Sequence, residues 1–286
     1  TISSIAVTGV TSGQYGNSGT YTVVVTASET LTAAPTLTLS GGSVGSGAGS
    51  TSDTVWTYTF TPTDADESVT IDVGAGAITD SAGNVNTATP SQFAFTHDAT
   101  APTASAVTIA VSGTGNANNG DVVTLTIDPS EVIGAPTCTW TDGSGAMEDT
   151  SVTYATVADT DHHTAAVTVA DADQDGTVGF SCTFSDLAGN AVASAVTALT
   201  GGSAITIDNT HPTISAVTAA WGTHLNAVED NSAGTVTVTT SGAADGQTVT
   251  TTINGVTDTC SVSSNSCAVT VAASDLQALT SGTTLS

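Results

Sequence analysis

The chain has 286 residues, of which 26 are Asp or Glu and none is Lys or Arg, so its formal net charge is −26. Without a basic side chain to bind phosphates we exclude nucleic acid as a partner, and catalysis through a lysine Schiff base or an arginine finger is impossible. Salt and divalent cations would reduce the repulsion among so many carboxylates, which favours an extracellular location in salty water.

Alternating apolar residues predict β-strands along most of the chain. Gly, Pro, Asn and Asp separate the apolar runs at about ten-residue intervals, a spacing typical of β-sandwiches. Only residues 273–279 have a helical pattern, with Ser274 as the expected N-cap. No run of about 18 apolar residues occurs, so we expect no membrane insertion in this segment. The clearest strand patterns are at residues 21–26, 56–60, 123–127 and 180–184.

Three short motifs recur in the same order at nearly the same spacing, which indicates a repeated domain. We therefore expect domains at residues 1–100, 101–210 and 211–286. The third would be incomplete, because it has no Asp-x-Ala-Gly-Asn motif and too few residues for its last strands. The matching pairs are Ser28-Glu29 with Ser130-Glu131, Asp80–Asn84 with Asp186–Asn190, and Asp98–Pro102 with Asp208–Pro212.

These motifs resemble the immunoglobulin-like repeats of large bacterial and archaeal cell-surface proteins, which have a Ser-Glu after the second strand, an Asp-x-Ala-Gly-Asn loop and an Asp-x-Thr-x-Pro linker. The third region is similar to repeats of giant biofilm adhesins through residues 225–229, 245–250, 253–256 and 275–279. Related repeats are expected in archaeal surface layers and in the flagellar hairs of marine algae. The resemblance implies an all-β chain of tandem immunoglobulin-like β-sandwich domains in an extended array at the cell surface.

In such a sandwich the loop after the second strand, the loop after the sixth strand and the entering linker lie at one end. Glu131, Asp186 with Asn190, and Asp98 occupy these three places, and their oxygen ligands suit Ca²⁺. Ca²⁺ is therefore the expected cofactor. The same reasoning assigns Asp208 and Glu229, with Asp230 beside it, to the next junction, and Glu29, Asp80 and Asn84 to a junction with a preceding domain.

Two less specific interpretations remain for the acidic residues. Asp80 and Asp186 would cap tight turns, and Ser-Glu would be a polar strand end. Residues 171–176 match the first half of an EF-hand loop, but Cys182 stands at the twelfth position, where a glutamate is needed. An acidic turn is the favoured interpretation there, and residues 64–67 occupy the corresponding place in the first domain.

The four cysteines permit two disulfides, which would require an oxidising compartment, and four cysteines allow three pairings. No Cys-x-x-Cys spacing supports a zinc site. The resemblance places Cys138 and Cys182 on neighbouring strands of one sheet, while Cys260 and Cys267 flank the turn of an expected hairpin. The predicted pairs are Cys138–Cys182 and Cys260–Cys267.

No set of residues predicts an enzyme. Residues 41–45 match the Gly-x-Ser-x-Gly nucleophile motif, but they lie in what we interpret as a flexible Gly/Ser loop with no helix after it. His162 and His163 would point to opposite faces of a strand, and surface-turn positions are favoured for both.

The leading hypothesis is an extracellular structural module of a large surface protein, forming a stalk, lattice or filament with calcium-rigidified domain junctions. Its partners would be other copies of itself or further domains of the same chain. The alternative is an adhesive module that binds cell-surface glycans, with Trp140 and Trp221 as candidate platforms, or a subunit of a flagellar-hair-type filament. Aromatic residues are only 4% of the chain, which disfavours the glycan alternative.

Overall fold

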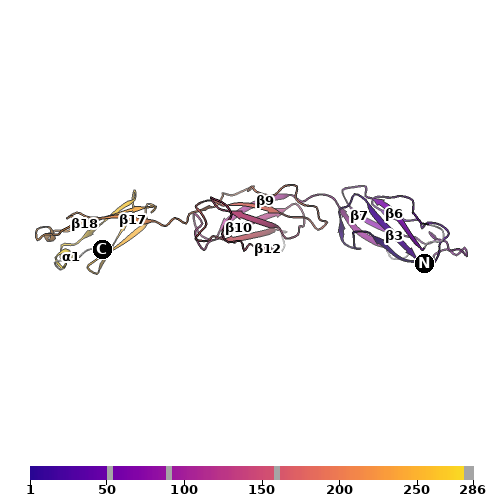
Figure 1. Ribbon diagram of the computed structural model, residues 1–286, viewed down its shortest axis with the longest axis horizontal. Coiled ribbons are helices and arrows are strands. Elements are labelled where there is room, and N and C mark those ends of the chain that lie inside the picture. Colours follow the sequence, from indigo (N-terminus) through magenta and orange to yellow (C-terminus); the bar gives the residue numbers. More distant parts are fainter. Residues whose placement is uncertain (50–53, 88–91, 158–161, 280–286) are drawn as a thin grey trace. The chain divides into compact units, whose positions relative to one another are not determined.

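The computed structural model describes residues 1–49, 54–87, 92–157 and 162–279, and confirms the all-β prediction (Figure 1). The chain divides into two compact units, Thr1–Asp208 and Asn209–Ser286. Hydrophobic clusters of the first unit lie within residues 2–95 and 104–207, and the second unit has its own cluster. The division into three domains at residues 100 and 210 stays a prediction. Among the described residues there is no helix with the length and apolar character needed to span a bilayer.

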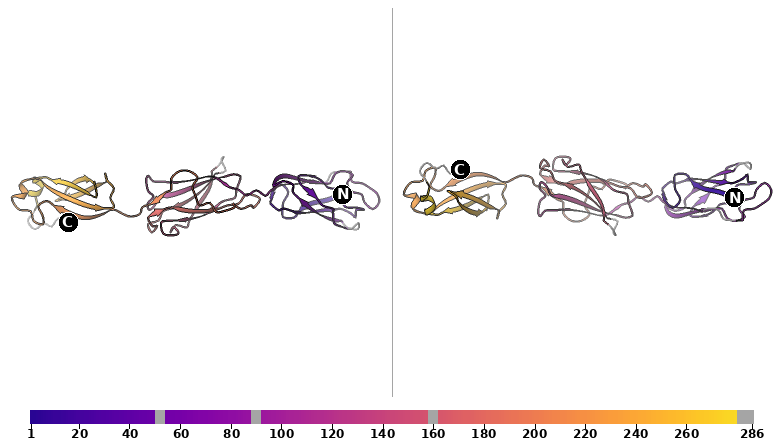
Figure 2. Two further views of the ribbon diagram at one scale, coloured as in Figure 1. Left: turned by 90° about the horizontal axis from the view of Figure 1, so that it is seen from above. Right: turned by 90° about the horizontal axis from the view of Figure 1, so that it is seen from below.

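The first sandwich, residues 1–98, consists of two four-stranded sheets with the orders β1-β3-β6-β5 and β2-β8-β7-β4. This is the A-B-E-D and C-F-G arrangement of an immunoglobulin sandwich, with β2 added in parallel beside the last strand. The two layers are visible in both views of Figure 2. The strands are β1 (Ile2–Val7), β2 (Tyr15–Gly16), β3 (Tyr21–Ala27), β4 (Thr38–Ser40), β5 (Ser43–Val44), β6 (Val55–Thr61), β7 (Asp66–Asp72) and β8 (Phe93–Asp98).

The Gly-rich segment 41–49 packs against a row of aromatic side chains from β6. A Cβ atom on Gly42 would lie 2.5 Å from the Phe60 ring, and one on Gly47 would lie 2.5 Å from the Tyr58 ring. Only glycine permits so close an approach of backbone to ring. The prediction of a loop was therefore wrong for part of this segment, because the Gly-x-Ser-x-Gly match contains the edge strand β5, which pairs with β6.

The second sandwich, residues 101–208, repeats the A-B-E-D sheet as β9-β10-β13-β12. The opposing layer contains the pairs β11-β15 and β14-β16. Ala117 bridges Ile207 in parallel, as β2 pairs with β8 in the first sandwich. The strands are β9 (Ala104–Val111), β10 (Val122–Pro129), β11 (Thr137–Thr141), β12 (Thr153–Val157), β13 (His162–Thr168), β14 (Gly176–Thr177), β15 (Gly179–Thr183) and β16 (Thr206–Ile207).

The disulfide of the second sandwich has the expected pairing. Cys138 of β11 lies directly opposite Cys182 of β15, and their Cα atoms are 4.1 Å apart. Trp140 is buried in the same core, so it is no platform for a glycan. His162 and His163 belong to β13, and His163 is only 6% exposed, so the surface-turn prediction was wrong.

The C-terminal sandwich has a three-stranded sheet, β17-β18-β21, facing a two-stranded sheet, β19-β20. Cys260 of β20 is bonded to Cys267 of β21. The pairing is the expected one, but the two strands belong to different sheets, so the disulfide joins the layers instead of closing a hairpin. The elements are β17 (Thr213–Ala219), η1 (Glu229–Asn231), β18 (Gly234–Ser241), β19 (Thr248–Ile253), β20 (Val256–Ser261), β21 (Ser266–Val271) and α1 (Ala273–Gln277).

The short helix α1 follows β21 as the sequence predicts. Its N-cap is Ala272 and not Ser274, and no side chain caps it through a hydrogen bond. Leu276 of α1 is 1% exposed and belongs to the core of the C-terminal sandwich. Packing of this one side chain therefore positions the helix.

Candidate metal site

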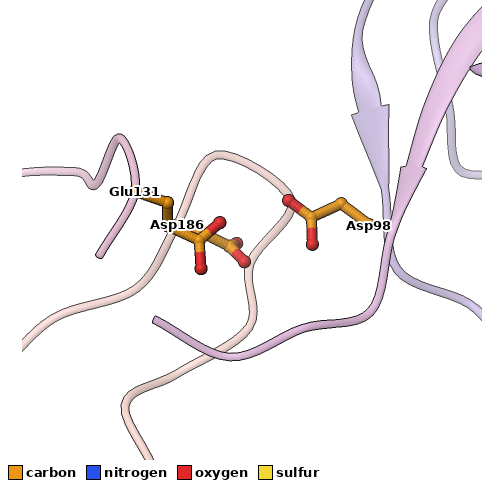
Figure 3. A group of neighbouring side chains, drawn as sticks. All are labelled: Asp98, Glu131 and Asp186. Atoms are coloured by element: carbon orange, nitrogen blue, oxygen red, sulfur yellow. The ribbon is translucent and has the colours of Figure 1, made fainter. Parts of the chain in front are cut away.

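Three of the predicted ligands, Asp98, Glu131 and Asp186, form one carboxylate cluster. One oxygen from each side chain lies within 4.8 Å of the others. Asp98 ends β8 of the first sandwich, whereas Glu131 and Asp186 lie in loops that follow β10 and β15 of the second sandwich. Figure 3 shows the Asp98 carboxylate directed toward the other two. The cluster thus joins the last strand of one sandwich to two loops of the next, within a single compact unit.

The Asp186 carboxylate also holds its own loop together. It accepts hydrogen bonds from the backbone N–H groups of Gly189 and Asn190, at 2.7 and 2.8 Å, and from the Asn190 amide at 2.7 Å. Gly189 has φ +96°, a left-handed conformation that favours glycine and explains its place in the motif. A carboxylate has about four lone-pair sites, so these three bonds leave capacity for a cation.

The matching loop of the first sandwich has the same turn. The Asp80 carboxylate accepts from the backbone N–H groups of Ala82 and Asn84 and from the Asn84 amide, each at 2.8 Å. The amide hydrogen bond from Asn84 is the main cause that lowers the pKa of Asp80. Turn capping therefore describes both Asp-x-Ala-Gly-Asn loops. The loops differ because Asp186 has two further carboxylates beside it.

Asn190 has a positioning role in the structure. Its side-chain N–H group donates to the Asp186 carboxylate and to the backbone carbonyl of Asp98, the latter at 2.9 Å. Its Oδ1 accepts from the amide of Asn17 at 3.1 Å. Asn190 was predicted as a ligand, and this stays a prediction, because an amide oxygen has two lone pairs and Asn17 uses only one of them. We missed Asn17, which lies between β2 and β3, because it belongs to none of the repeated motifs.

Asp66 is a second residue that the sequence analysis did not assign to the cluster. It begins β7 and lies opposite Asp98 in the strand register. Its Oδ2 accepts from the Thr100 hydroxyl at 2.8 Å, and this hydrogen bond is the main cause that lowers the pKa of Asp66. The Thr100 backbone N–H group donates to Asp98 at 3.2 Å. The threonine of the Asp-x-Thr-x-Pro linker thus links both carboxylates, and this motif was the available signal.

The electrostatics of the cluster are those of carboxylates close to one another. Burial is the main cause that raises the pKa of Asp98, and the negative charges of Asp186 and Asp66 add to it. Burial likewise raises the pKa of Glu131, and the Asp98 and Asp186 carboxylates contribute. The chain has no Lys or Arg to offset these charges. A divalent cation would relieve the repulsion.

The other predicted ligands do not join a three-carboxylate cluster within the part of the chain that the structure describes. Glu29 is exposed, and Asp80 belongs to the turn described above. Asp208 and Glu229 fall in different compact units, so the second junction, with Asp230, stays a prediction. Within its own unit, the Glu229 carboxylate accepts from the backbone N–H group of Asn226 at 3.0 Å.

The EF-hand-like segment 171–176 is held by an inward-facing carboxylate. Asp173 is only 2% exposed and accepts from the backbone N–H groups of Glu148 and Ala170, at 2.7 and 2.8 Å. Asp171 and Asp175 are exposed. These hydrogen bonds support the interpretation of an acidic turn.

No protein-family model matches the chain, and no curated protein matches it. Similar solved structures include the D00-D0 domain of intimin, 14% identical over 72% of this chain and 100% of that one, with a TM-score of 0.28. A marsupial T cell receptor is 9% identical over 93% and 94% of the two chains, with a TM-score of 0.39. The N-terminal eight Ig domains of Down Syndrome Cell Adhesion Molecule are 11% identical over 94% and 38%, with a TM-score of 0.27. These low scores carry no inference about function, and the immunoglobulin-like assignment rests on the strand order.

Proposed function

We propose that this chain is part of an extracellular structural module in which Ca²⁺ stiffens the connection between successive sandwiches. The observation that carries the proposal is that the three carboxylates of the cluster come from two successive sandwiches. Asp98 belongs to the first sandwich, and Glu131 and Asp186 belong to the second. A cation held by all three would restrain the linker between Asp98 and β9. Moving Asp98 away would break its bond to the ion and leave the three carboxylates without a shared positive charge.

Calcium fits this donor set better than other common cations. Ca²⁺ takes six to eight oxygen ligands in flexible geometry, whereas Mg²⁺ demands a near-ideal octahedron and keeps several waters. Zinc sites prefer Cys and His nitrogen or sulfur ligands, and the three side chains of the cluster offer only oxygen. Asp98, Glu131 and Asp186 would hold the ion, and Asn190 and Thr100 would position the carboxylates.

The remaining features fit an extracellular mechanical role. Two disulfides are typical of an oxidising compartment. A chain with no Lys or Arg offers trypsin-like proteases no cleavage site. Its partners would be further domains of the same chain or other copies of it, in a stalk, lattice or filament. The glycan-binding alternative has little support, because Trp140 is buried and Trp221 packs against the core of the C-terminal sandwich.

Calcium titration of the whole chain, followed by calorimetric melting with and without chelator, tests the proposal. A ligand at one hundred times its dissociation constant stabilises the folded state by about 2.7 kcal/mol. For a cooperative unit as large as Thr1–Asp208 such a gain raises the melting temperature by about 5–10 °C. Small-angle scattering should also show a narrower range of sizes with Ca²⁺ than with chelator.

The two Asp-x-Ala-Gly-Asn loops provide a matched pair of variants. Asp186→Asn and Asp80→Asn each replace one carboxylate oxygen by an amide nitrogen in the same type of turn. Only Asp186 lies beside Asp98 and Glu131. We expect Asp186→Asn to weaken calcium binding by about tenfold or more and Asp80→Asn to leave it unchanged. An identical melting curve in chelator, or equal losses in the two variants, would refute the calcium junction.

A further inference from the structure

The first strand of the C-terminal sandwich exposes its apolar side chains. Ile214 and Val217 of β17 are 61% and 63% exposed, although β17 pairs antiparallel with β18, with a register shift between Ile214 and Ala216. Their counterparts in the first sandwich, Ile2 and Ile5 of β1, are each 9% exposed. Large apolar side chains side by side on a strand are normally covered, and their exposure marks an interaction surface.

Nearly the same strand sequence is buried in the second sandwich. Residues 103–108 read Thr-Ala-Ser-Ala-Val-Thr and residues 213–218 read Thr-Ile-Ser-Ala-Val-Thr, so Val107 corresponds to Val217. Val107 is 1% exposed because the segment after β15 lies along β9. The backbone N–H group of Thr200 donates to the Val107 carbonyl at 3.0 Å, and Leu199 packs against the same core.

In the C-terminal sandwich a groove of about 250 Å³ lies between β17 and β19, beside Ile214. Ile214, Thr240 and Val249 are among its lining residues. The Thr240 side chain is only 6% exposed, and its buried hydroxyl has no hydrogen-bond partner among the described residues. Within that part of the chain, β17 pairs with β18 alone and β19 with β20 alone, so each has an open edge. An open edge, an unpartnered hydroxyl and the exposed Ile214 side chain thus meet at one groove, and the exposed Val217 follows on the same strand.

We propose that this groove is a strand-acceptor site, and that its occupant is an extended segment of the same polypeptide with apolar residues at alternate positions. An added strand would form main-chain hydrogen bonds with an open edge, cover Ile214 and Val217, and bring a donor or acceptor to Thr240. β8 shows the chemistry required, because Phe93 and Phe95 alternate with residues that point the other way.

The other two sandwiches indicate the source of the strand. In each, the layer opposite the first strand is completed by residues that follow the fifth strand of the fold, namely 62–98 after β6 and 169–208 after β13. In the C-terminal sandwich the fifth strand is β21, and α1 after it still packs Leu276 into the core. By analogy with these two sandwiches, we assign the covering strand to the same polypeptide rather than to exchange between copies.

The first test uses the chain as it stands, in chelator so that it is independent of calcium. Ile214→Ser/Val217→Ser should lower the fluorescence of a bound apolar dye, and any concentration-dependent association, by about threefold or more. The matched control is Val228→Ser in the same sandwich, since Val228 is 81% exposed but belongs neither to β17 nor to the groove lining. Equal effects of the two variants would overturn the acceptor site.

The second test asks whether a strand supplied within the same polypeptide occupies the groove, or whether a second copy of the chain already does. A copy of residues 92–98, fused after Ser286 through a flexible linker, should protect the β17 amides from hydrogen exchange while the protein sediments as a monomer. A control copy with both phenylalanines replaced by serine should leave the exchange unchanged. Equal protection by both copies would overturn recognition of alternating apolar residues. A discrete dimer of the unfused chain with β17 already protected would assign the strand to a second copy and overturn the single-polypeptide source.

Discussion

β9 in the second sandwich and β17 in the C-terminal sandwich differ little in sequence and greatly in burial. Val107 is 1% exposed and Val217 is 63% exposed, although the same Ser-Ala-Val-Thr stretch surrounds both. Each strand pairs with its neighbour in the same antiparallel way. The difference comes from the opposing layer, which covers β9 but does not cover β17. Strand formation is thus decided locally, whereas core formation is decided by the strands that follow.

The two disulfides fit the same contrast. Cys138–Cys182 lies within one sheet of a sandwich that has a large core, so it reinforces strands that are already packed. Cys260–Cys267 joins the two sheets of a sandwich with far fewer buried residues. Small cores commonly need a covalent link between their layers. We infer that Cys260–Cys267 contributes more to holding its two sheets together than Cys138–Cys182 does, although it closes the shorter loop.

Removing the disulfides should have the largest effect on stability. The entropy of the closed loop predicts a loss of about 4 kcal/mol for Cys138→Ala/Cys182→Ala and about 2 kcal/mol for Cys260→Ala/Cys267→Ala. Denaturant unfolding of both variants measures the two losses. Hydrogen exchange should show that the second variant opens β19–β20 while the second sandwich stays protected. Protection of β19–β20 without the disulfide would contradict its role in joining the layers.

Truncation of the two matched valines tests the comparison directly. Burial of a valine side chain contributes about 1.5–3 kcal/mol, so Val107→Ala should destabilise the second sandwich by about 1–2 kcal/mol. Val217→Ala should change the free energy of unfolding by less than about 0.5 kcal/mol, as for surface positions. Chemical unfolding followed by a probe in each sandwich gives both values. A loss for Val217→Ala as large as that for Val107→Ala would mean that β17 is covered in solution.

Much of the fold could be predicted because the signals are local. The alternation of Tyr21, Val23 and Val25 places one face of β3 in the core, and Trp56 to Phe60 do the same for β6. Turn residues bound these runs, so the positions of the strands followed from the sequence, whereas their order within the sheets was only implied by the resemblance. The Gly-rich segment 41–49 was misjudged because its glycines are fitted to aromatic rings of another strand. No local pattern reports such packing.

The candidate site divides in the same way. Asp98, Glu131 and Asp186 were predicted together because each lies in a repeated motif, and the structure brings them within reach of one ion. Asp66 was missed because its place opposite Asp98 is set by the register between β7 and β8. Asn17 reaches Asn190 across 173 positions of sequence. Contacts that depend on register or on distant loops cannot be read from one strand at a time.

The smallest expected effect is a dependence on pH, which separates the cluster from the Asp80 turn. The pKa values of Asp98 and Glu131 are raised above their usual 3.8 and 4.5, so between the usual and the raised values the folded state binds more protons than the unfolded chain. In chelator the contribution of these groups to stability should therefore fall as the pH rises through the raised pKa values. Asp80 has a lowered pKa, so its contribution is present above 3.8 and is lost as the pH falls through the lowered value.

Calcium should reverse the first trend, because the ion binds the deprotonated carboxylates. Melting temperatures with and without Ca²⁺ should therefore diverge as the pH rises from about 4 to 7. Without the ion, the free energy of unfolding should change by less than about 1 kcal/mol over this pH range, since partly exposed charges interact weakly. Asp186→Asn should remove the divergence and Asp80→Asn should retain it. Parallel curves for the wild-type chain across this range would show that the carboxylates repel one another without recruiting a cation.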